Sequence, residues 1–396
     1  MRIYTLLFLL LLASSSFAQV QLKGKIIDAL TEEPVSFATV YINGTTKGAY
    51  TEDDGSYVIE NVTFPIELVV SHVGYETQVV YLDSLVAKSI IIKVKSSSVE
   101  IETVKVVDNN KRRDNLREFT QYFLGMDELG TKAELLNDEV LRFDRDYAEA
   151  SIPKKAAQMI VENNISIDLG NTGVDGKVKY NRPLNLKATS REPLIVDQPE
   201  LGYKIRVDLV SFENIYPVRG KTMGRTAWLG HYYFEPYKTD KKRLQKRFAK
   251  NRQLAFYHST QHFMRSLFNQ KIPHNGYRLF ERVENPETRK VDYIPYDITE
   301  HLKYIDDDLV EIKGLKDKVF YLFYYYKGKG YPIDLSFGKK GKLFVQSELH
   351  FLADSCYVRS NGTTPGTNIL FAGPISEKKV GSTLPDDYVL TSYKKK

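Results

Sequence analysis

A small group of polar side chains lies in an otherwise apolar segment, residues 254–268, and could form a binding site. Its members are Tyr257, His262 and Arg265. An unpaired buried charge is costly, so we expect Arg265 to meet a carboxylate, a phosphate-like ligand or backbone carbonyls. One interpretation is an anion- or peptide-binding site with His262 and Arg265 on its wall. The other, which is the more common outcome for such clusters, is a satisfied polar network that fixes the segment against the sheet.

The same segment holds two histidines at the spacing of a zinc-binding helix. His258 and His262 are four residues apart, so they would share one helix face. The glutamate that follows the first histidine in zinc proteases is missing, because Ser259 stands there, and no third ligand is indicated. We therefore predict no metal, no cofactor and no catalytic residue.

Directly before this segment the sequence is strongly basic. Residues 241–252 contain seven Lys or Arg and no acid. These seven are Lys241, Lys242, Arg243, Lys246, Arg247, Lys250 and Arg252. Such a run is usually a solvated helix face. Cations in the first turns oppose the helix dipole, however, which indicates that something other than helix stability keeps them there. They are candidate contacts for an anionic surface, with lipid headgroups or cell-surface polysaccharide as partners, whereas nucleic acid is not expected after secretion.

One long helix, at about residues 240–269, is expected to carry both groups. Asp240 is a plausible N-cap for it. The first half of this helix is polar, while the second half has apolar residues on more than one side, which predicts that only the second half is buried.

The other elements of the C-terminal region are predicted from periodicity. A helix is expected at 108–125, where apolar residues follow helical spacing. The rest of residues 126–396 has strand-like patterns separated by Gly, Pro and Asn turns. The Asn/Gly-rich stretch 153–180 is expected to be extended.

The first 18 residues have the pattern of a secretory signal peptide. Arg2 supplies the positive start, residues 6–12 form an apolar run, and small residues precede a cleavage site at Gln19. The run is far shorter than the ~20 residues that cross a bilayer as a helix, and no later transmembrane span is predicted. We expect the chain to be secreted across the inner membrane, to the periplasm or the outer membrane.

The composition is that of a folded chain without disulfide bonds. Hydrophobic residues make up 42% of the 396 residues, which excludes a disordered chain, and the length suits two or three domains. A single cysteine excludes an intramolecular disulfide and a cysteine-based zinc site. The net charge of +6 is mild and does not by itself imply nucleic acid.

Residues 20–95 alternate between apolar and polar positions and contain regularly spaced turn signals, which predicts a small antiparallel sandwich. The run 24–62 resembles the carboxypeptidase regulatory-like domain, a seven-stranded transthyretin-like sandwich, and we place this domain at 19–107. The positions that carry the resemblance are Gly24, Asp28, Pro34, Val35, Ala38, Val40, Gly44, Thr45, Gly48, Thr51, Asp54, Gly55, Tyr57, Gly74 and Tyr75. The resemblance implies an appended module without peptidase chemistry.

The remainder of the chain also resembles a bacterial family, whose members pair such a domain with a second domain of unassigned role. The likeness rests on RRDNLREFTQYFLG (112–125), LNDEVLRFD (136–144), the stretch 192–212, FYHSTQHFMRSLFN (256–269) and STLPDDY (382–388). It implies an architecture and an envelope location, but it brings no activity.

We therefore predict a mainly β (α+β) protein. An N-terminal seven-stranded transthyretin/Ig-like β-sandwich is followed by a mostly β domain with one long helix. The predicted function is a non-enzymatic binding or assembly module of the bacterial cell envelope, with an envelope protein, glycan or anionic lipid headgroups as partner. The alternative is a secreted hydrolase of unrecognised type, with a site around Tyr257, His262 and Arg265.

Overall fold

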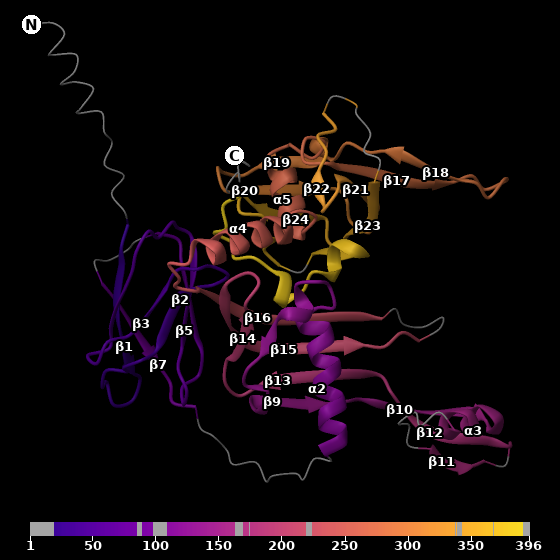
Figure 1. Cartoon of the computed structure of the whole chain (residues 1–396), viewed down its shortest axis with the longest axis horizontal. Helices are drawn as coiled ribbons and strands as arrows, with labels where there is room; N and C mark the ends of the chain where they lie inside the picture. The colour runs from indigo at the N-terminus through magenta and orange to yellow at the C-terminus, as the bar shows by residue number, and fades with distance from the viewer. Residues whose placement is uncertain are drawn as a thin grey trace, which may run out of the picture. The chain divides into compact units, whose positions relative to one another are not determined.

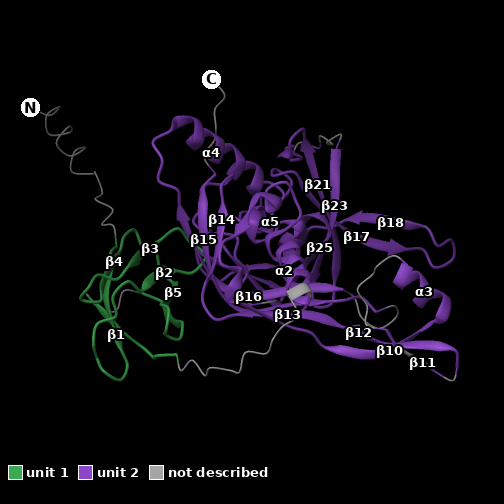
Figure 2. Cartoon of the chain, turned by 60° about the horizontal axis from the view of Figure 1, so that its bottom comes forward, with its two compact units in different colours: residues 1–103 green, residues 104–396 purple. Residues whose placement is uncertain are grey.

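The chain divides into two compact units, residues 1–103 and 104–396 (Figure 2). The computed structural model describes residues 20–84, 89–97, 109–162, 169–173, 175–218, 224–336, 338, 343–366 and 368–390. The predicted signal peptide, at 1–18, lies outside these residues. No helix in the described ranges is long and apolar enough to cross a membrane.

The first unit is the predicted seven-stranded β-sandwich (Figure 1). Its strands are β1 (Leu22–Asp28), β2 (Thr39–Ile42), β3 (Gly48–Tyr50), β4 (Ser56–Ile59), β5 (Ile66–Ser71), β6 (Gln78–Leu82) and β7 (Ile90–Val94). One sheet has the order β4-β1-β7 and the other β3-β2-β5-β6, and only the β1–β7 pair is parallel. Alternate residues such as Ile26, Val40 and Leu68 form one buried core, as the period-2 pattern requires.

The second unit contains two separate cores, and the first is built on a twisted antiparallel sheet. The sheet has the order β8-β14-β15-β13-β9, with β16 paired to β15. Its strands are β8 (Glu134–Leu135), β9 (Leu141–Asp144), β13 (Asn185–Ser190), β14 (Leu194–Gln198), β15 (Tyr203–Ile215) and β16 (Arg225–Pro236). Helix α2 (Asn109–Leu124), where a helix is predicted, lies across this sheet and contributes Phe119 and Phe123 to the core (Figure 1).

A small sheet with its own helix follows β9. It has the order β10-β12-β11, from β10 (Tyr147–Pro153), β11 (Leu169–Thr172) and β12 (Lys177–Pro183). The prediction of an extended stretch at 153–180 is wrong for its first part, where α3 (Lys154–Glu162) forms. The Asn/Gly-rich residues that suggested a loop come after this helix, and α3 itself is amphipathic, with Ala157 buried.

The second core lies among two further antiparallel sheets. One has the order β18-β17-β21-β23-β25, with β22 on β21, and the other has the order β19-β20-β24. The strands are β17 (Tyr277–Glu284), β18 (Val291–Pro295), β19 (Leu302–Tyr304), β20 (Leu309–Lys313), β21 (Val319–Lys327), β22 (Tyr331–Pro332), β23 (Leu343–Phe351), β24 (Ser355–Arg359) and β25 (Ile369–Ala372). Short 3-10 helices are η1 (Gly130–Lys132), η2 (Asp138–Val140), η3 (Ile298–His301), η4 (Pro374–Glu377) and η5 (Val380–Ser382). The single cysteine, Cys356, is buried in this core.

The segment expected to be one long helix is two helices. These are α4 (Lys242–Phe256) and α5 (Thr260–Phe268). His258 between them has a left-handed backbone, with φ of 56°, and the Ser259 side chain caps α5 by accepting a bond from the backbone N–H of His262. The predicted N-cap Asp240 is also wrong, because α4 begins after Lys241 without a side-chain cap.

The break between α4 and α5 has a physical reason in the two cores. The end of α4 places Ala255 and Phe256 in the first core, whereas α5 places Phe263 and Leu267 in the second. If the helix continued straight, Phe263 and Leu267 would follow the axis of α4 and would not reach the second core. The turn at His258 redirects the chain so that each helix buries its own apolar face.

Candidate functional site

The three residues predicted as a binding cluster lie at the junction between α4 and α5. Tyr257 directly follows α4, while His262 and Arg265 lie on α5. The ring of His262 contacts Tyr257 edge-on at 5.4 Å and Phe256 at 4.9 Å, and the guanidinium of Arg265 lies 5.4 Å from the Phe256 ring. The structure therefore brings the three side chains together around Phe256.

His262 is a core residue, with only 3% of its surface exposed. Its Nδ1 lies 2.9 Å from the Tyr277 hydroxyl and accepts a 3.3 Å bond from the backbone N–H of His258. If both neighbours donate, the neutral ring carries its proton on Nε2. Burial, assisted by the positive charges of Lys378 and Arg265, lowers the pKa of His262 to about 3.

Arg265 meets backbone carbonyls, one of the three kinds of partner expected from the sequence. Its Nε donates to the carbonyl of Asn361 at 2.7 Å, and its two Nη atoms donate to the carbonyls of Tyr388 at 2.7 Å and Asp386 at 2.9 Å. A planar guanidinium can satisfy three diverging acceptors in this way. Arg265 thus joins α5 to the loop after β24 and to the C-terminal segment.

These contacts favour the structural interpretation of the cluster. The polar atoms of His262 and Arg265 that are described above are engaged within the protein, and Tyr257 is half-buried among aromatic rings. No group of three or more His, Cys, Asp or Glu side chains suited to a metal ion occurs in the part of the chain that the structure describes. The hydrolase alternative gains no support from the contacts in this cluster.

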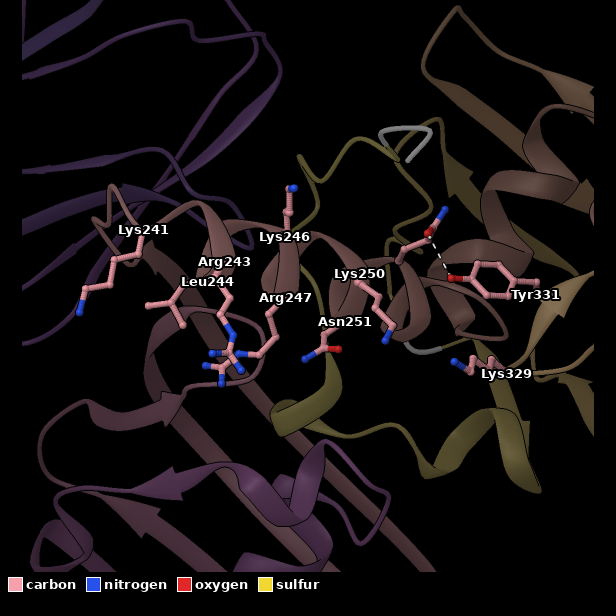
Figure 3. A pocket seen from close by; sticks show the side chains of 10 residues that line it. Lys241, Arg243, Leu244, Lys246, Arg247, Lys250, Asn251, Lys329 and Tyr331 are labelled. Atoms are coloured by element: carbon pink, nitrogen blue, oxygen red, sulfur yellow. Dashed lines mark hydrogen bonds between the residues drawn. The ribbon is translucent and has the colours of Figure 1, made fainter. Parts of the chain in front are cut away.

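The basic run forms a different kind of site, a groove of about 1030 Å³ along α4 (Figure 3). It is lined by Lys241, Arg243, Leu244, Lys246, Arg247, Lys250, Asn251, Gln253, Lys329 and Tyr331. Six of these side chains are cationic and none is acidic. The groove therefore concentrates positive charge beside a concave surface, where an anion is favoured.

The predicted cations do not all belong to this groove. Five of the seven line it, but Lys242 and Arg252 are not among the lining residues. Arg252 donates to the carbonyls of Leu201 at 2.7 Å and Gly202 at 3.1 Å. Its guanidinium also lies 3.9 Å from the centre of the Tyr203 ring, so this cation holds the helix to the sheet.

Two lining residues come from far along the sequence. Lys329 lies in the turn between β21 and β22, and Tyr331 begins β22, so both lie beside the C-terminal half of α4 (Figure 3). The Tyr331 hydroxyl lies 3.5 Å from the Gln253 side-chain oxygen, and its ring meets Tyr257 at 5.4 Å. The sequence gives no local signal for this approach, because it depends on the packing of the second core.

The groove cations are largely free of acidic partners. Arg247 lies 3.7 Å from Glu200, but within the described ranges no ion pair is found for the other five cations, Lys241, Arg243, Lys246, Lys250 and Lys329. All five are exposed to solvent. Their charge is therefore available to a ligand.

The turn 199–202 fixes the side of α4 that faces the sheet. Asn251 donates to the carbonyl of Glu200 at 3.0 Å and to its carboxylate at 2.9 Å. Phe248 packs closely against the backbone of Gly202. A Cβ atom on Gly202 would lie 2.5 Å from the Cδ2 atom of Phe248. Gly202 also has φ of +68°, so both the space and the backbone require glycine.

A partly buried lysine closes the C-terminal end of α4. The ammonium group of Lys378 donates to the carbonyls of Leu254 at 3.2 Å, Ala255 at 2.8 Å and Tyr257. These carbonyls are among those a helix end leaves without partners, and a cation there also complements the helix dipole. Burial lowers the pKa of Lys378 to about 8. The groove helix is thus anchored at its end by the segment that follows η4.

We expect Gly202→Ala to destabilise the protein by about 2 kcal/mol or more, because the new methyl group overlaps Phe248 and the left-handed backbone disfavours alanine. Chemical denaturation followed by circular dichroism measures the loss. Gly176→Ala is the matched control, since Gly176 has φ of +73° but nothing within 4 Å of its Cβ position. Equal losses in both variants would contradict the assigned clash with Phe248.

Comparison with known proteins identifies the first unit. Residues 22–106 match the family model of the CarboxypepD_reg-like domain, so this part of the chain is a domain of that family. The match confirms the resemblance found in the sequence, and the β-sandwich agrees with it. No curated protein matches the chain. The match does not extend over the groove in the second unit.

Proposed function

We propose that this protein, which carries a CarboxypepD_reg-like domain at its front, is a non-enzymatic binding module of the bacterial cell envelope. Its second unit holds an anionic component of the envelope in the groove along α4. The envelope location rests on the signal-peptide pattern of the first 18 residues and on the full-length family resemblance. The protein acts in the periplasm or at the outer membrane.

One observation carries this proposal: of the described residues that line one concave surface, six are cationic and none is acidic. Five of these cations have no ion pair in the described ranges, and the helix that bears most of them is fixed by Arg252, Asn251 and Lys378. A rigid helix loses little conformational freedom when a ligand binds. Exposed charges also attract an opposite charge in a salt-dependent way.

Binding of a model polyanion tests the proposal. We expect the purified protein to bind dextran sulfate but not neutral dextran, with an affinity that falls as salt is raised. The triple variant Arg243→Gln/Lys246→Gln/Lys250→Gln should lose about tenfold or more in affinity, which titration calorimetry measures.

A second triple variant controls for net charge. Lys132→Gln/Lys303→Gln/Lys316→Gln removes the same three charges from exposed positions outside the groove. We expect it to bind dextran sulfate almost as tightly as the unchanged protein. If both triple variants weaken binding alike, the attraction comes from overall charge and the groove is not the site.

A further inference from the structure

The geometry of the groove points to a linear anionic polysaccharide as its ligand, a chain of sugar rings that carries carboxylate, sulfate or phosphate groups. This inference rests on the proposed function and names the ligand class of the same site. It is carried by two features of the lining, a row of cations along α4 and a group of amide and aromatic side chains beside β22, where Lys329 adds a further cation (Figure 3).

The cationic part of the groove is extended in one direction. Arg243, Lys246 and Lys250 are spaced by three and four residues, so they follow one face of α4. At 1.5 Å per residue, they cover about 10 Å along the helix axis. A row of charges of this length matches a polymer with repeated anionic groups, whereas a single phosphate would engage only one or two of them.

The end of the groove beside β22 also has groups that can bind sugar rings. Gln253 offers an amide, Asn251 offers its side-chain oxygen because its nitrogen donates to Glu200, and Tyr331 offers a hydroxyl and an aromatic ring. The Gln253 amide lies 3.4 Å from the Tyr257 hydroxyl and its oxygen 3.5 Å from the Tyr331 hydroxyl. Amides and phenols pair with sugar hydroxyls, and an aromatic ring packs against the apolar face of a sugar. A polyanion without rings would leave the ring of Tyr331 unused.

The lining disfavours the two other large anionic partners. Among the described lining residues only Leu244 is aliphatic, so the groove offers no apolar face to enter a bilayer. A flat lipid surface also cannot follow a concave groove. A nucleic-acid strand needs several aromatic platforms for successive bases, and the described part of the lining provides one ring, that of Tyr331.

Three probes and one aromatic variant test this inference. Titration calorimetry compares polygalacturonate, which has a carboxylate on each sugar ring, with polyglutamate, which has carboxylates but no rings. Vesicles of phosphatidylcholine and phosphatidylglycerol provide the lipid arm. Tyr331→Leu removes the ring beside β22, and Tyr147→Leu removes a tyrosine that is 55% exposed and lies outside the groove. Circular dichroism first verifies that each variant is folded, and Tyr331→Phe, which loses only the hydroxyl, replaces Tyr331→Leu if it is not.

We expect polygalacturonate to bind more tightly than polyglutamate. Tyr331→Leu should weaken polygalacturonate binding about tenfold and leave polyglutamate unchanged, while Tyr147→Leu changes neither. Equal binding of both polymers, with no effect of Tyr331→Leu, would overturn the polysaccharide inference but leave the anion-binding function intact. Tighter binding of vesicles would likewise overturn it in favour of a membrane. If neither polymer nor dextran sulfate binds through the groove, the proposed function fails as well.

Discussion

Replacing Arg265 by methionine should lower the free energy of unfolding by about 3 kcal/mol or more. The change leaves the carbonyls of Asn361, Asp386 and Tyr388 without their donor. Each unmade bond to a buried group costs about 1 kcal/mol or more. Chemical denaturation measures the loss, and limited proteolysis should show earlier cleavage of the C-terminal segment, which Arg265 ties to α5.

Two further variants separate the role of geometry from that of charge. Arg265→Lys keeps the charge but cannot reach three diverging carbonyls, so we expect an intermediate loss. Arg243→Met removes an exposed cation of α4 and should leave stability within about 0.5 kcal/mol of the unchanged protein. If Arg265→Met is as stable as Arg243→Met, the three bonds do not hold the segments together.

Mild acid should destabilise the second unit through two histidines. Burial lowers the pKa of His258 and His262 to about 3, whereas an unfolded histidine titrates near about 6.5. Between these values the unfolded chain binds protons that the folded protein does not, so stability falls as the pH drops below about 6.5. At about 1.4 kcal/mol per pKa unit, each imidazole lowers stability by up to about 2 kcal/mol at pH 5.

The double variant His258→Asn/His262→Asn tests this dependence. Asparagine tolerates the left-handed backbone at position 258, where φ is 56°, and its oxygen can accept a bond near the position of the His262 Nδ1. Between pH 7 and pH 5 we expect the unchanged protein to lose up to about 4 kcal/mol relative to this variant. The comparison cancels the opposite contribution of Asp386, whose pKa burial raises to about 7 in both proteins. Parallel pH curves for the two proteins would show that other groups cause the acid sensitivity.

The sandwich and helix α2 could be predicted because their signals are local. Alternating apolar residues in β1 face one core, and the spacing of Phe119 and Phe123 places both on the buried side of α2. Such periodicity reports which face of an element is buried, whatever lies opposite. Apolar periodicity therefore predicts the type and position of the sandwich strands and of α2.

The break after α4 and the full lining of the groove could not be predicted in the same way. The apolar spacing continues through His258, and only Ser259, a capping residue, marks the start of a second helix. Arg252 and Lys250 are neighbours in a basic run, yet one is bound to the turn after β14 and the other lines the groove. Lys329 joins that groove only through tertiary packing, which no short stretch of sequence encodes.

The return of the C-terminal segment to the first core sets the order in which the second unit can fold. Val380 and Leu384 complete the first core, and Ser382 bonds the carboxylate of Asp127, which is 255 residues earlier in the chain. All strands of the second core lie between these two positions. Contacts that close so long a loop form late, because the chain must first lose the corresponding entropy. A growing chain can thus assemble the sandwich early, but the groove helix gains its Lys378 cap only after nearly all of the second unit has been made.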